Sequence, residues 1–103
     1  MELINEQEFN ERIKGEKPVV CDFFAKWCAP CRMLAPVLED VGEKFSGKAD
    51  FVKVDIDENF SLAQKYSVMS IPLVAVFENG EMKAKSLGYM NKEEAEKFLN
   101  ENL

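Results

Sequence analysis

Residues 19–31 of this chain read VVCDFFAKWCAPC, and its architecture is best worked out from there. The segment from Val19 to Ala25 is an apolar run that does not alternate with polar residues, which is typical of a central strand buried on both faces. An amphipathic segment from Met33 to Phe45 follows and predicts a helix. A strand that turns tightly into a helix therefore brings Cys28 and Cys31 together on one face of the first helical turn.

The position of these two cysteines indicates their chemistry. The unpaired backbone N–H groups and the positive dipole end at the start of a helix stabilise an anion. A thiolate is such an anion, and it is the reactive form of cysteine. We expect dithiol–disulfide exchange, in which Cys28, nearest the helix start, attacks. Cys31, expected to be less exposed and less readily ionised, then resolves the mixed disulfide.

Length and charge exclude several classes of function. A chain of 103 residues is expected to form one domain, residues 1–103. Thirteen basic residues against nineteen acidic ones give a net charge of −6, so neither nucleic acid nor an anionic membrane is an expected partner. The first residues show no secretory signal, and no run is long enough to span a membrane. We therefore expect a cytoplasmic protein, and a monomer.

The chain contains no histidine. This excludes Ser-His-Asp and Cys-His catalysis and every histidine-ligated metal site. Zinc binding stays a distant alternative, because a tetrahedral site wants four ligands and only three cysteines are present. No bound cofactor is expected.

Hydrophobic periodicity and turn signals predict an α/β domain of order β-α-β-α-β-α-β-β-α. A short helix is expected between Asn5 and Gly15, another from Asp57 or Asn59 to Tyr66, and a last one after Asn91. Asn79-Gly80 is a strong hairpin signal. Strands are expected at residues 3–4, 19–25, 51–56, 73–77 and 81–87, with Lys83 and Lys85 on an exposed edge.

Several stretches together resemble the thioredoxin family across essentially the whole chain. They are residues 22–31 (DFFAKWCAPC) with Ala35-Pro36, residues 52–55 (VKVD), residues 70–72 (SIP), residues 77–80 (FENG) and Gly88. The resemblance implies the thioredoxin fold, with a central mixed five-stranded sheet flanked by four helices. It also implies a protein-disulfide reductase that a thioredoxin reductase recharges. The chain departs from the family pattern at three positions. Ala29 stands where the family usually has glycine, Phe24 where a second tryptophan is common, and Leu73 where threonine is frequent. Of these, Ala29 bears on the reduction potential and on recognition by the reductase.

Asp22 is a carboxyl group within an apolar strand, so burial is expected to raise its pKa above the usual value of about 4. The alternative is an edge-strand aspartate that faces water. In the family the matching aspartate assists deprotonation of the resolving thiol, and the resemblance implies that role for Asp22. The resemblance implies that the strand of Lys53 lies beside that of Asp22, so Lys53 is either an ion-pair partner that moderates this pKa or a snorkelling surface lysine.

The resemblance also implies a substrate-binding surface around the cysteines. Pro30, favoured in a first helical turn, keeps the potential low in this family. A cis peptide bond is implied before Pro72, so that the Ile71 backbone can pair with an extended substrate segment. Gly88 is either a simple turn or a gap for the substrate backbone. The expected apolar rim consists of Trp27, Ser70-Ile71-Pro72 and Leu87-Gly88-Tyr89, and Ala29 lies beside it.

Cys21 is the third cysteine of the chain, and we interpret it as a core residue.

Two alternatives to a reductase remain at this point. One is a glutaredoxin-like protein or an oxidase or isomerase of the same fold, which the absence of a glutathione-site signature, of a histidine between the cysteines and of a secretion signal disfavours. The other is a non-catalytic interaction module that uses the fold as a subunit or chaperone.

Overall fold

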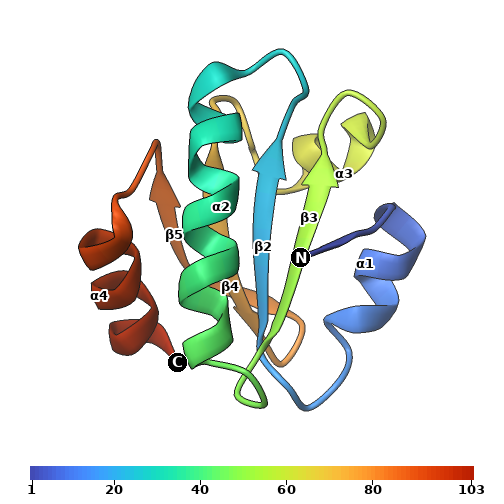
Figure 1. Cartoon of the computed structure of the whole chain (residues 1–103). Helices are drawn as coiled ribbons and strands as arrows, with labels where there is room; N and C mark the ends of the chain where they lie inside the picture. The colour runs from blue at the N-terminus through green and yellow to red at the C-terminus, as the bar shows by residue number, and fades with distance from the viewer.

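A five-stranded mixed sheet forms the centre of the computed structural model, which describes all residues 1–103. Its order is β1-β3-β2-β4-β5 (Figure 1). β1 and β2 pair parallel with β3, whereas β4 pairs antiparallel with β2 and β5. The strands are β1 (Glu2–Leu3), β2 (Val19–Phe24), β3 (Asp50–Asp55), β4 (Leu73–Glu78) and β5 (Glu81–Leu87).

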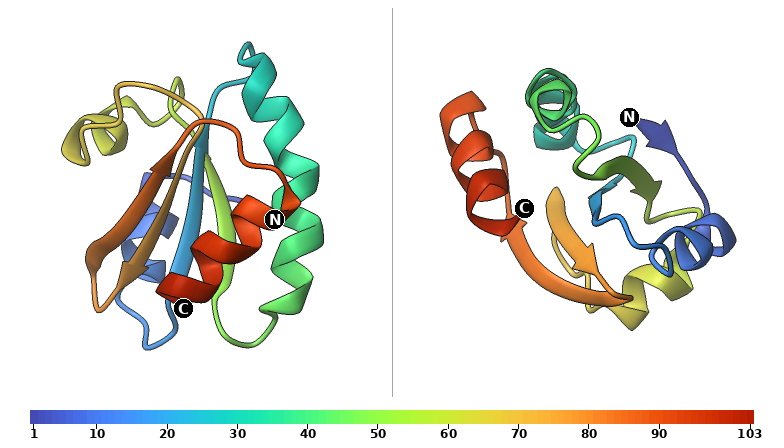
Figure 2. Two further views of the ribbon diagram at one scale, coloured as in Figure 1. Left: turned by 90° about the vertical axis from the view of Figure 1, so that its left-hand side faces the viewer. Right: turned by 90° about the horizontal axis from the view of Figure 1, so that it is seen from below.

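Four helices cover the two faces of the sheet. They are α1 (Glu6–Arg12), α2 (Ala29–Lys44), α3 (Phe60–Lys65) and α4 (Lys92–Asn102). α2 and α4 lie on one face, and α1 and α3 lie on the other (Figure 2). The predicted element order, the mixed five-stranded sheet and the four flanking helices are confirmed.

Local signals fix where several elements begin. Asn5 starts α1 with a capping box in which its side chain accepts from the Glu8 N–H, and Asn91 starts α4 in the same way. Asn79 and Gly80 join β4 to β5 with φ angles of 55° and 80°, as a two-residue hairpin turn requires. On β5 the side chains of Lys83 and Lys85 are exposed, as expected for an outer strand.

Alternation along β2 divides the core between the two faces. Val19, Cys21 and Phe23 lie in the cluster under α1 and α3, where Phe9 packs edge-on against Phe77 at 4.9 Å between ring centroids. Val20 lies in the cluster under α2 and α4. The interpretation of Cys21 as a core residue is confirmed, and its neighbour Asp22 consequently points toward the α2 face.

Two local predictions need correction. β1 covers Glu2–Leu3 instead of residues 3–4, because Ile4 already leads into the cap of α1. Asn59 is the N-cap residue of α3, and its carbonyl accepts from the Ala63 N–H, but its side chain does not cap the helix, since its Oδ1 accepts from the Glu6 N–H at 2.9 Å. Asp57 does not cap α3 either, because its carboxylate bonds to Trp27. None of the helices has the length and apolar character needed to cross a membrane.

Candidate active site

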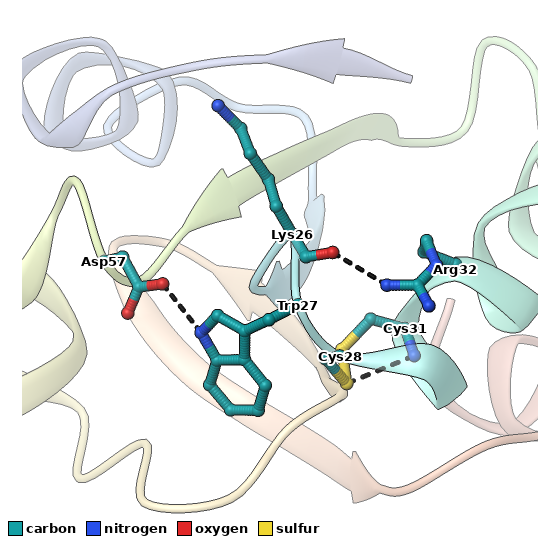
Figure 3. The surroundings of a disulfide bond; sticks show 6 residues. All are labelled: Lys26, Trp27, Cys28, Cys31, Arg32 and Asp57. Atoms are coloured by element: carbon teal, nitrogen blue, oxygen red, sulfur yellow. Dashed lines mark hydrogen bonds between the residues drawn. A yellow bond between two sulfur atoms is a disulfide. The ribbon is translucent and has the colours of Figure 1, made fainter.

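Cys28 and Cys31 form a disulfide at the start of α2, with Cα atoms 5.2 Å apart. Cys28 is the N-cap residue, one position outside the helix, and the Cys31 N–H donates to its Sγ at 3.3 Å (Figure 3). Both residues are buried, with 4% and 2% of their surface exposed. The sulfur of Cys28 therefore takes the place that a serine or aspartate oxygen occupies in an ordinary helix cap.

The first turn of α2 leaves the field of the helix dipole at Cys28 uncompensated by any acidic side chain, since that turn contains none. Pro30 lies within this turn and Ala29 opens it, and both are exposed. Proline suits this position, because its missing N–H is one that would have no helical partner. The helix start is thus prepared for a negative charge on Cys28.

Trp27 precedes the disulfide and is 68% exposed. Its indole Nε1–H donates to Asp57 Oδ2 at 2.8 Å, as Figure 3 shows. On the other side of the motif, the Arg32 guanidinium donates to the Lys26 carbonyl at 2.8 Å. These two hydrogen bonds tie the loop between β2 and α2 to the turn after β3 and to the start of α2.

Asp22 is buried in the central strand β2, with 2% of its surface exposed, and its Oδ1 has no hydrogen-bond partner. The alternative of an edge-strand aspartate facing water is therefore excluded. Burial raises the pKa of Asp22 from 3.8 to about 7, and the positive charge of Lys53 offsets part of this rise. The carboxyl group consequently changes its charge near neutral pH.

A pocket of about 270 Å³ has Asp22, Cys31 and Lys53 in its lining. Lys53 is half-buried, and its ammonium lies 5.6 Å from the centroid of the Phe24 ring. Of the two alternatives for Lys53, a closed ion pair with Asp22 is not formed, although the positive charge of Lys53 does lower the Asp22 pKa. The pocket thus brings a titratable carboxyl group and the second cysteine to the same space.

The loop before β4 completes the site. The Ile71–Pro72 bond is cis, and Ile71 packs against the cluster that contains both cysteines. Gly88 has a φ of +96°, and its N–H donates to the Pro72 carbonyl at 2.8 Å. Ser70 is exposed while Pro72 itself is buried, and the rest of the expected rim, Trp27, Leu87 and Tyr89, is exposed.

Comparison with known proteins gives one consistent result. The family model named Thioredoxin matches residues 1–101. Proteins named thioredoxin from Staphylococcus epidermidis and Staphylococcus haemolyticus are each 44% identical over 100 residues, which cover 97% of this chain and 95% of theirs. A thioredoxin of Staphylococcus aureus is 42% identical over the same shares.

The chain belongs to the thioredoxin family. It is a thiol-disulfide oxidoreductase of that family, and the Cys28–Cys31 disulfide is its redox-active centre. The family fold and a disulfide reductase were the predictions from sequence, and both are confirmed. No three Cys, Asp or Glu side chains gather into a group that could hold a metal ion.

Beside this thioredoxin-family centre lie residues that sequence reasoning missed. Asp57 holds the Trp27 indole, and Asp55, only 3% exposed, accepts from the Asp57 N–H at 2.9 Å. A groove of about 510 Å³ borders Asp57 and includes the exposed side chains of Phe60 and Met69. The available signal was an aspartate at the end of a strand with a second aspartate two positions later.

Proposed function

We propose that this protein reduces disulfide bonds in other proteins, with Cys28 as the attacking thiol, Cys31 as the resolving thiol and Asp22 as the proton acceptor for Cys31. The observation that carries the proposal is the position of the Cys28 sulfur. It occupies the N-cap of α2, where the Cys31 N–H points at it and no acidic side chain in the first turn competes for the dipole.

In the first step the Cys28 thiolate attacks one sulfur of a substrate disulfide. The substrate S–S bond breaks, a mixed disulfide forms at Cys28, and the other substrate sulfur leaves as a thiolate that takes a proton from water. The helix start stabilises the attacking anion.

In the second step Cys31 must lose its proton while buried behind Cys28. Asp22 lines the same pocket, and its pKa of about 7 suits a base that works at neutral pH. The Cys31 thiolate then attacks the Cys28 sulfur, which closes the disulfide and expels the second substrate sulfur as a thiolate, and this thiolate takes up the proton held by Asp22. Two electrons have passed from the dithiol to the substrate, the two protons that the substrate gains come from water and from Asp22, and Lys53 adjusts the basicity of Asp22.

Substrate polypeptide is proposed to lie across the exposed residues around the disulfide. Trp27 and Ala29 offer contact on one side, and Ser70, Ile71 and Gly88 on the other, where the Ile71 backbone can pair with an extended segment. Pro72 holds this loop against the cysteines, and Pro30 keeps the reduction potential low.

The remaining parts of the proposal concern partners and place. A thioredoxin reductase is the proposed electron donor, and disulfide-containing proteins are the proposed acceptors. The protein is proposed to act in the cytoplasm, where thiols are kept reduced, as a monomer made of one domain at residues 1–103. Its net charge of −6 argues against nucleic acid or an anionic membrane as a partner.

Trapping of mixed disulfides tests the assignment of roles. Cys31→Ser should accumulate substrate proteins attached covalently to Cys28, whereas Cys28→Ser should accumulate none. The reverse pattern would exchange the two roles. Insulin reduction with dithiothreitol as electron donor should require Cys28, and an inactive protein would point to a binding module. A reduction potential of about −270 mV, the value typical of thioredoxins, would fit a reductase. A potential of about −180 mV would fit an isomerase or oxidase.

A further inference from the structure

The orientation of the Trp27 side chain depends on one polar contact. The indole is largely exposed, and its only hydrogen bond runs from Nε1–H to Asp57 Oδ2. Figure 3 shows the ring beside Cys28 with its nitrogen directed toward Asp57. An exposed aromatic ring with little packing around it keeps one orientation only if its acceptor is itself fixed. The position of Asp57 therefore sets the position of Trp27.

Asp57 is exposed, but its backbone N–H is fixed by a hydrogen bond to Asp55. The Asp55 side chain is 3% exposed, and its Oδ1 accepts from the Asp57 N–H at 2.9 Å. This contact of a carboxylate with the N–H two residues on is the bond of an Asx turn, which fixes the direction of the chain between them. The direction in which Asp57 presents its carboxylate follows from that turn.

The same turn is anchored to the rest of the site at both ends. The Ile56 N–H donates to the Phe24 carbonyl at 2.9 Å, which joins the turn to the last residue of β2. The Asp55 carbonyl accepts from both the backbone N–H and the side-chain amide of Asn59, each at 3.0 Å. Asp55 is thus the internal brace of a turn whose ends do not move freely.

We propose that Asp55 is a positioning residue that acts through Asp57 to hold the Trp27 indole in its docking orientation for protein substrates. The inference rests on the proposed function, because it treats Trp27 as part of the substrate-binding surface. Burying a carboxylate is costly unless it is hydrogen-bonded, and here the bond goes to the turn that carries Asp57. Asparagine at position 55 would keep an acceptor for the Asp57 N–H, whereas alanine would leave that N–H without its partner.

Trp27 is the only tryptophan of the chain, so its indole N–H gives a single NMR signal whose exchange with water reports the bond to Asp57. Asp57→Ala should speed this exchange roughly two- to tenfold, the range expected for loss of one hydrogen bond. Asp55→Ala should speed it by a comparable factor, and Asp55→Asn should restore the wild-type rate. Equal exchange in wild type and Asp55→Ala, or no restoration by Asp55→Asn, would overturn the proposal.

Kinetics separate positioning from the chemistry of the cysteines. Asp55→Ala should raise the KM for a protein disulfide roughly two- to tenfold and leave kcat and the rate with a small aromatic disulfide unchanged. In the Asp57→Ala background, Asp55→Ala should add no further change, because both act through one contact. Full additivity of the two substitutions would contradict this. A protein that reduces neither substrate would refute the proposed function, while the exchange measurement would still decide the role of Asp55.

Val41→Ala is the matched control for a general loss of stability. Val41 is a fully buried residue of α2, in the core cluster between this helix, α4 and the sheet, so its truncation should lower stability but leave indole exchange at the wild-type rate. Should Asp55→Ala fail to fold, the amide of Asp57 in the wild-type protein still tests the brace. Slow exchange of that N–H is expected, and exchange as fast as that of an open loop would overturn the proposal.

Discussion

Asp22 and Lys53 are register partners on β2 and β3, yet no ion pair joins their side chains. The Lys53 ammonium lies over the Phe24 ring instead, 5.6 Å from its centroid. Its charge still lowers the pKa of Asp22, but burial dominates and leaves that pKa at about 7. A closed ion pair would have kept the carboxylate charged throughout the neutral range, and a proton could then not have been taken up there.

The first prediction concerns stability against pH. The unfolded chain loses the Asp22 proton near 3.8, and the folded chain keeps it up to about 7. Asp22 therefore lowers the free energy of unfolding progressively as the pH rises between these values, by an amount on the order of 4 kcal/mol. Asp22→Asn should remove this decline, as urea titrations at pH 4 and pH 8 would measure. An equal decline in the variant would contradict a raised Asp22 pKa.

The second prediction concerns rate against pH. Asp22→Asn removes the proposed acceptor for the Cys31 proton, so resolution of the mixed disulfide should slow on the order of 10- to 100-fold at pH 7. The inflection that Asp22 contributes near pH 7 should also vanish from the profile of insulin reduction. An unchanged profile would show that Cys31 loses its proton by another route.

The third prediction concerns Lys53. Replacing it with methionine keeps a long apolar side chain over Phe24 but removes the positive charge, so the pKa of Asp22 should rise above about 7. Titration of the Asp22 carboxyl carbon by NMR measures this directly. Lys85→Met is the control, since Lys85 is an exposed residue of β5, and it should leave the Asp22 titration where it is.

The fourth prediction concerns Gly88. Its φ of +96° is a backbone conformation that would be strained for any residue with a side chain, although an added Cβ would meet no atom within 4 Å. Gly47 has a φ of +86° and the same free space, so each alanine variant should cost about 1–2 kcal/mol of stability.

Gly88 and Gly47 both have a positive φ and free space for an added Cβ, which makes Gly47→Ala the matched control. Only Gly88→Ala should raise the KM for a protein disulfide, because only Gly88 borders the Pro72 loop. Comparable KM values in the two variants would mean that Gly88 serves the turn alone.

The sequence predicted what depends on neighbours along the chain. The uniform apolar run of β2 indicated a strand covered on both faces, and the capping box at Asn5 and the cap at Asn91 marked the helix starts that the structure has. The burial of Asp22 followed from its place in that run. These features are local, so one stretch of sequence carries all the information they need.

Contacts between distant residues escaped the sequence analysis. Asp57 looked like a cap for α3, but its partner is Trp27, thirty residues earlier, and the side-chain oxygen of the N-cap residue Asn59 bonds to Glu6 instead of to its own helix. Both side chains are of types that favour helix N-caps, but each one forms a hydrogen bond with a residue distant in the sequence. Lys53 was placed on the correct strand, but the direction of its flexible side chain was set by the Phe24 ring.

The three longer helices differ in the charge of their first turns. α1 and α4 each begin with two glutamates in the first turn, and α2 begins with none. Carboxylates at the ends of the chain thus neutralise the local positive potential, while the same potential at α2 is left for sulfur to use. A single glutamate at position 29 or 30 would compete with the Cys28 thiolate for this positive potential. Such a surface substitution, although much milder than loss of a cysteine, should therefore slow disulfide reduction.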